Sequence, residues 1–249
     1  MPSSMKTLLV GKNSKDIAGL VKQLGFQIVT EHPDVIISYG GDGTLLYAER
    51  MHPGAPKLPI RDSSVCKKCP QHGEKVLLEK LLAGKLQLKE YRKLETTILY
   101  QTFYALNDSV IRNLHPMHTI RFKVTSSTSH PGLDPGSINN KLLIGDGIVV
   151  ATPFGSTGYF HSITRKSFEQ GFGVAFNNTT EKVDPLFLKD EDEVTFKLIR
   201  GNATLSFDNN PDLFNIDAGS EITFKLSNQV AKIYELESLR CPDCEVTRG

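Results

Sequence analysis

The sequence predicts two domains: an α/β domain with a parallel sheet over residues 1–90, and a mostly antiparallel β domain over residues 91–236. In the first ninety residues, short apolar runs alternate with segments whose apolar residues recur at helical spacing. After about residue 90, apolar and polar residues alternate one by one, which is typical of half-buried antiparallel strands. The length of 249 residues allows one large domain or two smaller ones.

The first elements can be assigned in chain order. Lys6–Val10 is predicted to be a short strand, and a helix follows from Ser14 and ends at Gly25. One face of this helix carries Ile17, Leu20, Val21 and Leu24. The unbroken apolar run Val35–Ile37 indicates a strand buried on both faces of a parallel sheet.

The rest of the first domain contains two further predicted helices. Leu45–Met51 reads as a helix, and residues 52–59, with three prolines and a glycine, are predicted to form a loop. Glu74–Ala83 has apolar residues in helical period, and Gly84 stands at its end.

Strands dominate the second domain. The predicted strands are Ile120–Val124, Val194–Leu198, Leu205–Phe207, Ile222–Leu226 and Ile233–Leu236. The Ser-, Pro- and Gly-rich residues 126–139 are predicted to be a loop between strands, and residues 237–249 a tail that returns to the first domain.

Composition excludes several classes of protein. Hydrophobic residues make up 39% and charged residues 23%, which excludes disordered and collagen-like chains. With 29 basic and 28 acidic residues, no global field would attract nucleic acid or an anionic membrane, so an anionic ligand must be bound locally. No apolar stretch reaches the ~18 residues that span a bilayer, and no export signal is seen, so a cytoplasmic location is expected.

A glycine-rich turn follows the buried strand. Gly40–Thr44 contains three glycines, which let a phosphate approach the backbone, and it opens a helix whose N–H groups favour anions. Asp42 is then a candidate general base or magnesium ligand. The alternative is a tight turn in which Asp42 is the helix N-cap. The spacing fits neither a P-loop nor a Rossmann fingerprint.

Two further segments could bind a nucleotide. Gly145–Gly147 is a second glycine turn, and the hydroxyl-rich loop Thr152–Tyr159 could contact ribose and stack on a base. Asn107–Asp108 sets an amide beside a carboxylate, which can hold two hydroxyls or a purine edge. Each segment can equally be an ordinary polar loop or turn.

In this order, Gly40–Thr44, Asn107–Asp108 and the stretch from Gly145 to Tyr159 resemble the NAD kinase family. The resemblance implies transfer of a phosphoryl group from ATP or polyphosphate to the 2′-hydroxyl of the adenosine ribose of NAD, which gives NADP. It also implies magnesium bound with ATP, and a homodimer or homotetramer.

The resemblance assigns roles to individual residues. Asp42 matches the catalytic aspartate that takes the proton from the 2′-hydroxyl. The phosphate donor would lie against Gly40, Gly41, Gly43 and Thr44. The residues implied to bind NAD are Asp42, Gly43, Asn107, Asp108, His118, Asp146, Thr157, Gly158, Tyr159 and Ser162.

The sequence departs from the family pattern at several positions. Residues 60–64 replace an Asn-x-Gly segment, Phe154 replaces a hydroxyl residue, and Asp208 is followed by Asn209 where Asp-Gly is common. Two alternatives therefore stay open: a nucleotide-binding regulatory paralogue without activity, and a lipid or sugar-phosphate kinase that shares the Gly-Gly-Asp-Gly turn. No basic amphipathic stretch supports the lipid kinase.

Four cysteines form two Cys-x-x-Cys pairs, Cys66 with Cys69 and Cys241 with Cys244. Four thiolates in this arrangement are typical of a structural zinc site, which would join the C-terminal tail to the first domain. Disulfides and free or redox-active thiols are the alternatives.

Overall fold

The computed structural model describes residues 4–62, 66–67, 72–127, 140–234, 236–240 and 245–246. The chain divides into two units: unit 1 comprises Met1–Tyr91 and Val230–Gly249, and unit 2 comprises Arg92–Gln229. The chain enters unit 2 within strand β6 (Leu88–Ile98) and leaves it within β17 (Glu221–Tyr234). The predicted fold class, α/β followed by antiparallel β, is confirmed.

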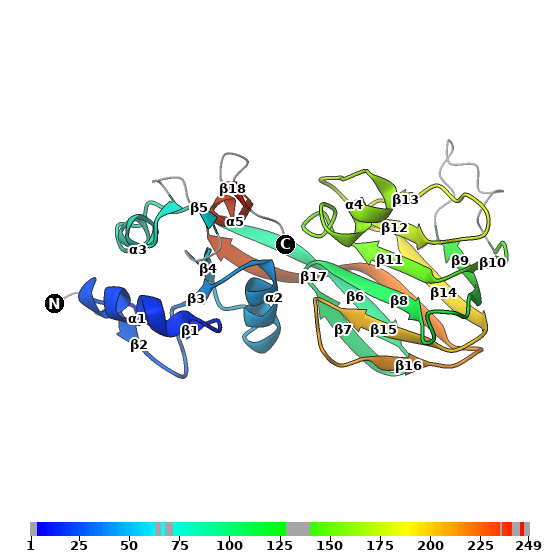
Figure 1. Ribbon diagram of the computed structural model, residues 1–249, viewed down its shortest axis with the longest axis horizontal. Helices are drawn as coiled ribbons and strands as arrows, with labels where there is room; N and C mark the ends of the chain where they lie inside the picture. Colours follow the sequence, from blue (N-terminus) through cyan, green and yellow to red (C-terminus); the bar gives the residue numbers. More distant parts are fainter. Residues whose placement is uncertain are drawn as a thin grey trace. The chain divides into compact units, whose positions relative to one another are not determined.

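Unit 1 is built on a parallel sheet. Its strands lie in the order β4-β3-β1-β2, and the end of β17 adds to β4 in parallel through Ile233 and Lys57 (Figure 1). The four strands are β1 (Lys6–Val10), β2 (Gln27–Ile28), β3 (Val35–Tyr39) and β4 (Lys57–Ile60). All five residues of β3 are buried, as the apolar run predicts.

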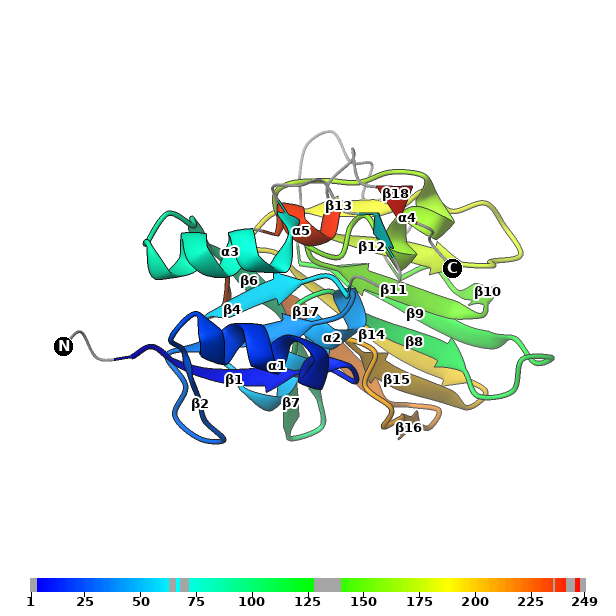
Figure 2. The same cartoon turned by 60° about the vertical axis from the view of Figure 1, so that its left-hand side comes forward.

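Helices cover both faces of this sheet. Helices α1 (Ser14–Gln23) and α3 (Glu74–Leu82) lie over one face, where residues such as Val21 and Leu77 share a core with Ile37 (Figure 2). Helix α2 (Asp42–Met51) covers the other face, because Ala48 packs with Ile36. Since consecutive residues of β3 point to opposite faces, one strand supplies both cores.

The prediction of a loop over residues 52–59 is wrong from Lys57 onward, because strand β4 begins there. All four residues of β4 are buried between β3 and β17. The fully buried Lys57 forms an ion pair with Glu49 of α2 and donates a hydrogen bond to the His52 carbonyl at 2.7 Å. The Pro59 carbonyl accepts a hydrogen bond from the Ser238 hydroxyl at 2.6 Å.

The C-terminal segment lies in unit 1. Helix α5 (Glu237–Arg240) contacts β4, and Arg61 donates a hydrogen bond to the Leu239 carbonyl. Strand β18 (Glu245–Val246) pairs antiparallel with β5 (Cys66–Lys67), so the C-terminal segment and the first segment of unit 1 form a short two-stranded sheet (Figure 1).

Unit 2 contains strands of two sheets that share one core, and its strands pair antiparallel in the residues that the structure describes. The first group comprises β6, β7 (Gln101–Ala105), β9 (Ile120–Ser126), β10 (Leu143–Gly145), β14 (Glu193–Arg200) and β17. The second sheet has the order β13-β12-β11-β8-β15-β16. Its strands are β8 (Asp108–Asn113), β11 (Gly147–Ala151), β12 (Phe172–Asn177), β13 (Leu186–Leu188), β15 (Ala203–Phe207) and β16 (Phe214–Ile216).

The core of unit 2 is rich in aromatic side chains. Phe122 and Phe196 stack with ring centroids 5.2 Å apart, and they share a cluster with Ile148 and Leu205 of the second sheet. Helix α4 (Tyr159–Thr164) covers the outer face of the second sheet, where the fully buried Phe160 packs against Val149. The second sheet is therefore buried on both faces where α4 lies over it.

Strand β17 differs from the two separate strands predicted for this region. It runs unbroken from Glu221 to Tyr234, so Leu236 is not part of this strand. Its buried side chains shift from even-numbered to odd-numbered positions between Leu226 and Ala231, and the Gln229 N–H bonds to the Ser227 hydroxyl at 3.0 Å. This change of phase interrupts the period-two pattern, which explains the prediction of two strands.

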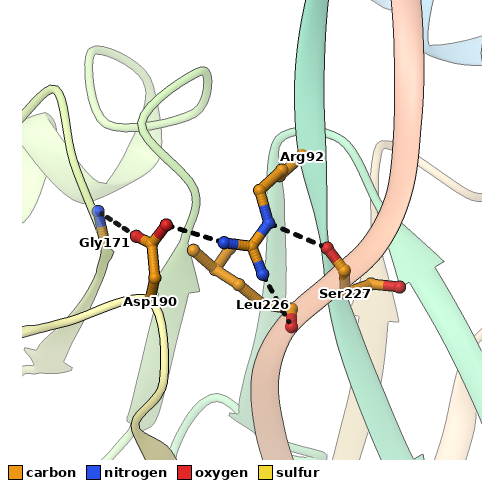
Figure 3. A network of polar contacts seen from close by, with 5 residues as sticks. All are labelled: Arg92, Gly171, Asp190, Leu226 and Ser227. Carbon is orange, nitrogen blue, oxygen red and sulfur yellow. Dashed lines mark hydrogen bonds and ion pairs between the residues drawn. The ribbon is translucent and has the colours of Figure 1, made fainter.

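Arg92 ties four segments of unit 2 together (Figure 3). Its guanidinium donates to the Ser227 carbonyl at 3.0 Å, to the Leu226 carbonyl at 3.4 Å and to Asp190 Oδ2 at 2.6 Å. Asp190 Oδ1 in turn accepts the Gly171 N–H at 3.1 Å. The network fixes the irregular part of β17 to the loops that flank β12 and β13.

Candidate functional site

The Gly40–Thr44 turn joins the buried β3 to α2 in unit 1. Gly40 has φ +156°, and a Cβ atom there would lie 2.3 Å from Thr44 Oγ1, so the turn requires glycine at this position. The Gly40 N–H donates to the Ile60 carbonyl at 2.9 Å, which fixes the start of the turn to β4.

The N-cap of α2 is Gly41, and Asp42 is the first helical residue. The alternative in which Asp42 caps the helix is therefore wrong, and α2 begins three residues earlier than predicted. The carboxyl group of Asp42 is exposed in the first turn of the helix, as is Gly43. The N-terminus of a ten-residue helix and an exposed carboxylate thus lie together in unit 1.

The Asn107–Asp108 pair lies in unit 2, where a tight turn joins β7 to β8. Asp208 accepts the backbone N–H of Leu106 at 2.6 Å and that of Asn107 at 2.7 Å. On the other side, Thr152 donates its hydroxyl to the Leu106 carbonyl at 2.6 Å and its N–H to the Asn107 carbonyl at 3.0 Å. The Asn107 amide donates to Asp108 Oδ2 at 3.2 Å, so the two predicted binding residues are in contact.

The loop after β11 packs against this turn. A Cβ atom at Gly155 would lie 2.0 Å from the Asn107 carbonyl oxygen. One at Gly158 would lie 3.6 Å from the side-chain nitrogen Nδ2 of Asn107. Thr157, between these glycines, is exposed. The structure therefore brings Asn107, Asp108 and Gly158 together within one unit.

Several hydroxyls in this loop bond to the protein's own backbone. Ser162 Oγ donates to the Tyr159 carbonyl at 2.7 Å, and Ser156 Oγ donates to the Pro153 carbonyl at 2.9 Å. These two bonds agree with the alternative interpretation of the loop as locally satisfied. The Tyr159 hydroxyl instead accepts the Asn177 amide at 3.2 Å.

Asp146 is held at the opposite end of β11 from Thr152. The side-chain amides of Asn178 and Asn113 donate to its carboxylate at 3.0 and 3.4 Å. The Asn113 amide also donates to the His118 carbonyl at 3.0 Å, so Asn113 links Asp146 to the segment that contains His118. His118 itself lies in an exposed turn between β8 and β9 and not within a strand.

The predicted NAD-binding residues of unit 2 thus form two groups at the ends of one strand. Asn107, Asp108 and Gly158 lie near the end of β11, and Asp146 lies at its start. Five residues of extended chain span roughly 17 Å, so a ligand that contacts both groups must be extended, as a dinucleotide can be. Tyr159 contacts Asn177, whose partner in the ladder is Gly147, next to Asp146.

Two carboxyl groups are buried beside the Asn107 turn. Asp108 is 8% exposed and Asp208 is 4% exposed. Burial, and then the charge of Asp208, raise the pKa of Asp108 to about 7. Burial also raises the pKa of Asp208 to about 6, although three backbone N–H groups and the charge of Lys93 act in the opposite direction.

Four residues that support this site had no individual role assigned from the sequence, although Thr152 and Asp208 stood in noted segments: Asp208, Thr152, Asn177 and Asn178. Asp208 and Asn209 both have left-handed backbone conformations, with φ of 48° and 52°. The Asp-Asn-Asn run was a visible signal, because Asp and Asn tolerate this conformation better than most residues.

Three of the four cysteines, Cys69, Cys241 and Cys244, lie outside the described residues. Cys66 belongs to β5, which pairs with β18. In the sequence, β18 begins directly after Cys244. In the part of the chain that the structure describes, no group of three or more His, Cys, Asp or Glu residues could hold a metal ion. Across the same ranges, no helix is long and apolar enough to cross a bilayer.

No family model matches the chain. A curated NAD kinase of Sulfurisphaera tokodaii is 33% identical over 175 residues, which are 65% of this chain and 63% of that protein. One from Helicobacter pylori is 31% identical over 44% of its length. The chain thus spans less than two thirds of these relatives. NAD kinase 2 of Bacillus subtilis is 24% identical over 91% of this chain and 88% of its own.

Solved structures extend the likeness to nearly the whole chain. An NAD kinase from Archaeoglobus fulgidus in complex with ATP has a TM-score of 0.73 at 18% identity, and covers 96% of this chain and 97% of its own. Yeast NADH kinase complexed with NADH also has a TM-score of 0.73, at 15% identity, over 94% of this chain and 84% of its own. At these identities the structural match establishes the fold alone. In sequence the chain is thus similar to NAD kinases, and it shares the fold of an NAD kinase and an NADH kinase.

Proposed function

We propose that the protein is an NAD kinase, which transfers a phosphoryl group from ATP or polyphosphate to the 2′-hydroxyl of the adenosine ribose of NAD. The observation that carries this proposal is that each unit contains groups suited to a different substrate. Unit 1 has a glycine turn with an exposed carboxylate at a helix N-terminus, and unit 2 has paired polar groups at both ends of β11. The first suits phosphoryl chemistry and the second suits an extended dinucleotide.

Asp42 is the proposed general base. An alcohol is a weak nucleophile near neutral pH, so a carboxylate must accept its proton as the new O–P bond forms. Asp42 is exposed in the first turn of α2, where a substrate hydroxyl can reach it. Gly40, Gly41, Gly43 and Thr44 would hold the phosphate donor through backbone N–H groups and the Thr44 hydroxyl.

Unit 2 would hold the acceptor. Asn107 and Asp108 present an amide and a carboxyl group to ribose hydroxyls or a purine edge, and Tyr159 offers a ring face for stacking. Asp146, Thr157, Gly158, Ser162 and His118 are the further proposed contacts. Most of the rate enhancement would then come from orientation of the hydroxyl toward the phosphate.

Magnesium would accompany ATP. The ion prefers carboxylate and phosphate oxygens, so the phosphates of ATP would hold it and would leave the Asp42 carboxylate as the base. When bound, magnesium would offset the negative charge of the phosphates, while Asp42 and the helix N-terminus keep the roles described above.

A coupled assay of NADP formation, with ATP and polyphosphate as separate donors, tests the proposal. We expect Asp42→Asn to abolish turnover and to leave NAD binding, measured by calorimetry, largely intact. Asp16→Asn is the matched control, because Asp16 is also an exposed aspartate in the first turn of a helix of unit 1. Turnover that survives Asp42→Asn would refute its role, and NAD binding without turnover by the unmodified protein would favour a regulatory paralogue.

We also propose that the two cysteine pairs hold a structural zinc ion. Pairing of β5 with β18 supports this, because Cys66 starts β5 and Cys244 immediately precedes β18 in the sequence. Four thiolates are the donor set that zinc prefers. One equivalent of zinc in the purified protein, with no free thiols before chelation, is expected; less than half an equivalent with four reactive thiols would refute the site.

The assembly is proposed to be a homodimer or homotetramer, as the family resemblance implies. Light scattering of the purified protein measures this directly, and a monomer at micromolar concentration would contradict it.

A further inference from the structure

The turn that carries Asn107 is held by side chains from two distant parts of unit 2. The carboxylate of Asp208 accepts both N–H groups of the turn, and Thr152 donates to both carbonyl groups. Every backbone polar group of Leu106 and Asn107 is therefore bonded. We call Asp208 and Thr152 the turn clamp.

We propose that the turn clamp positions the Asn107 side chain for dinucleotide binding, so that Asp208 and Thr152 are positioning residues of the site. This inference rests on the proposed function, because it assumes that Asn107 contacts the dinucleotide. It assigns no contact with the ligand to the clamp residues themselves.

Burial separates the clamp from the residue that it holds. Asp208 is 4% exposed and Thr152 is fully buried, whereas Asn107 is only partly buried and can meet a ligand. The clamp hydrogen bonds are thus shielded from water, which makes them directional constraints of greater strength than surface bonds. The partly buried Asn107 is therefore held in a fixed orientation.

The clamp also carries a cost that an ordinary turn would not need. Asp208 is a buried carboxylate beside a second one, Asp108, and its backbone lies in the left-handed region with φ 48°. Both features are unfavourable by themselves. A neutral turn with a glycine would join β7 to β8 without either of them, so the arrangement is better explained by the geometry that it imposes on Asn107.

Substitutions can separate positioning from stability. In Asp208→Asn, one N–H of the turn would face the amide group of the new side chain and lose its acceptor. Thr152→Val keeps the shape of the side chain and removes the hydroxyl that donates to Leu106. The second variant keeps the test decisive if the first does not fold.

Asp192→Asn is the matched control. Asp192 is 1% exposed, belongs to unit 2 and accepts the Lys189 N–H at 2.8 Å in the turn between β13 and β14. It therefore accepts a backbone N–H in the same way, in a turn that contains none of the proposed binding residues. Its substitution is expected to lower the melting temperature while the affinity for NAD stays unchanged.

The experiment measures NAD affinity by calorimetry on the full chain, with melting temperature as a second readout. We expect Asp208→Asn and Thr152→Val each to weaken NAD binding by about tenfold. In an Asn107→Ala background, the same substitutions should weaken binding by less than about twofold, because the clamp acts through Asn107.

Unchanged NAD affinity in both clamp variants would overturn the inference, and so would an equal loss with and without the Asn107 side chain. A loss of affinity in Asp192→Asn as large as in the clamp variants would overturn it as well. Failure of the unmodified protein to bind NAD or form NADP would instead refute the proposed function, so the two failures can be distinguished.

Discussion

Replacement of Asp108 by Asn should flatten the dependence of the protein's stability on pH. In the unfolded chain this carboxyl group ionises near its ordinary pKa of 3.8, whereas in the folded protein burial and the charge of Asp208 raise the pKa to about 7. Between these values the folded state binds more protons than the unfolded state. The free energy of unfolding therefore falls as pH rises through this range, and levels off above pH 7.

The size of the effect follows from the shift. At about 1.4 kcal/mol per pKa unit, the raised pKa of Asp108 destabilises the fully ionised protein by about 4 kcal/mol. About 3 kcal/mol of this is lost between pH 5 and pH 8. Asp108→Asn removes the ionisation and keeps an oxygen that can accept the Asn107 amide. The variant should thus lose about 3 kcal/mol less than the unmodified protein over the same interval.

Urea unfolding at pH 5, 6, 7 and 8, followed by circular dichroism, measures this difference. Asp16→Asn, which removes an exposed carboxyl group from α1, controls for the loss of one acidic side chain. Parallel pH profiles for Asp108→Asn and the unmodified protein would refute the reasoning, because they would mean that Asp108 ionises alike in the folded and unfolded states.

Two further predictions concern single contacts. Lys57→Met should destabilise the protein by about 3–5 kcal/mol in urea unfolding, because the buried Glu49 carboxylate loses its ammonium partner. The double variant with Glu49→Gln should recover most of this loss, and an equal loss in both would contradict the explanation. Gly155→Ala should lower both the melting temperature and the affinity for NAD, because the added Cβ atom would meet the Asn107 carbonyl oxygen at 2.0 Å. Gly19 lies on α1, where an added Cβ atom would meet no neighbouring segment within 4 Å. Gly19→Ala should therefore stabilise the protein by up to about 1 kcal/mol. Equal melting temperatures for the two variants would refute the steric argument.

Local pattern was enough to predict the elements whose stabilising contacts are close in sequence. Helix α1 begins at Ser14, as expected, and Gly25 after its end has φ +92°. Strand β3 is buried on both faces, as its apolar run indicates. These features depend on a short window of residues, so periodicity and end signals suffice to find them.

Elements that depend on distant partners were not predictable in this way. Strand β4 contains Pro59 and a buried lysine, and it is a strand because β3 and β17 flank it and Glu49 neutralises Lys57. Proline and lysine otherwise favour a loop or an exposed position.

The site shows the same contrast. The Asn107–Asp108 pair and the glycine turn stand out as motifs, whereas Asp208 acts on a turn 101 residues earlier. No spacing rule connects residues that far apart, and only the pairing of β15 with β8 brings them together. The raised pKa of Asp108 depends on the same pairing and on burial, so it too required the structure.

The interrupted chain of unit 1 has a consequence for how the protein is made. The parallel sheet is completed by Ile233 beside Lys57, and Ser238 bonds to Pro59, yet all of unit 2 is synthesised between these segments. Unit 2 is a single stretch and can finish folding on the ribosome, while one edge of β4 stays uncovered until the segment that starts at Val230 emerges. An uncovered apolar strand edge invites association with other chains, so a fragment that stops at Tyr91 should aggregate rather than fold alone.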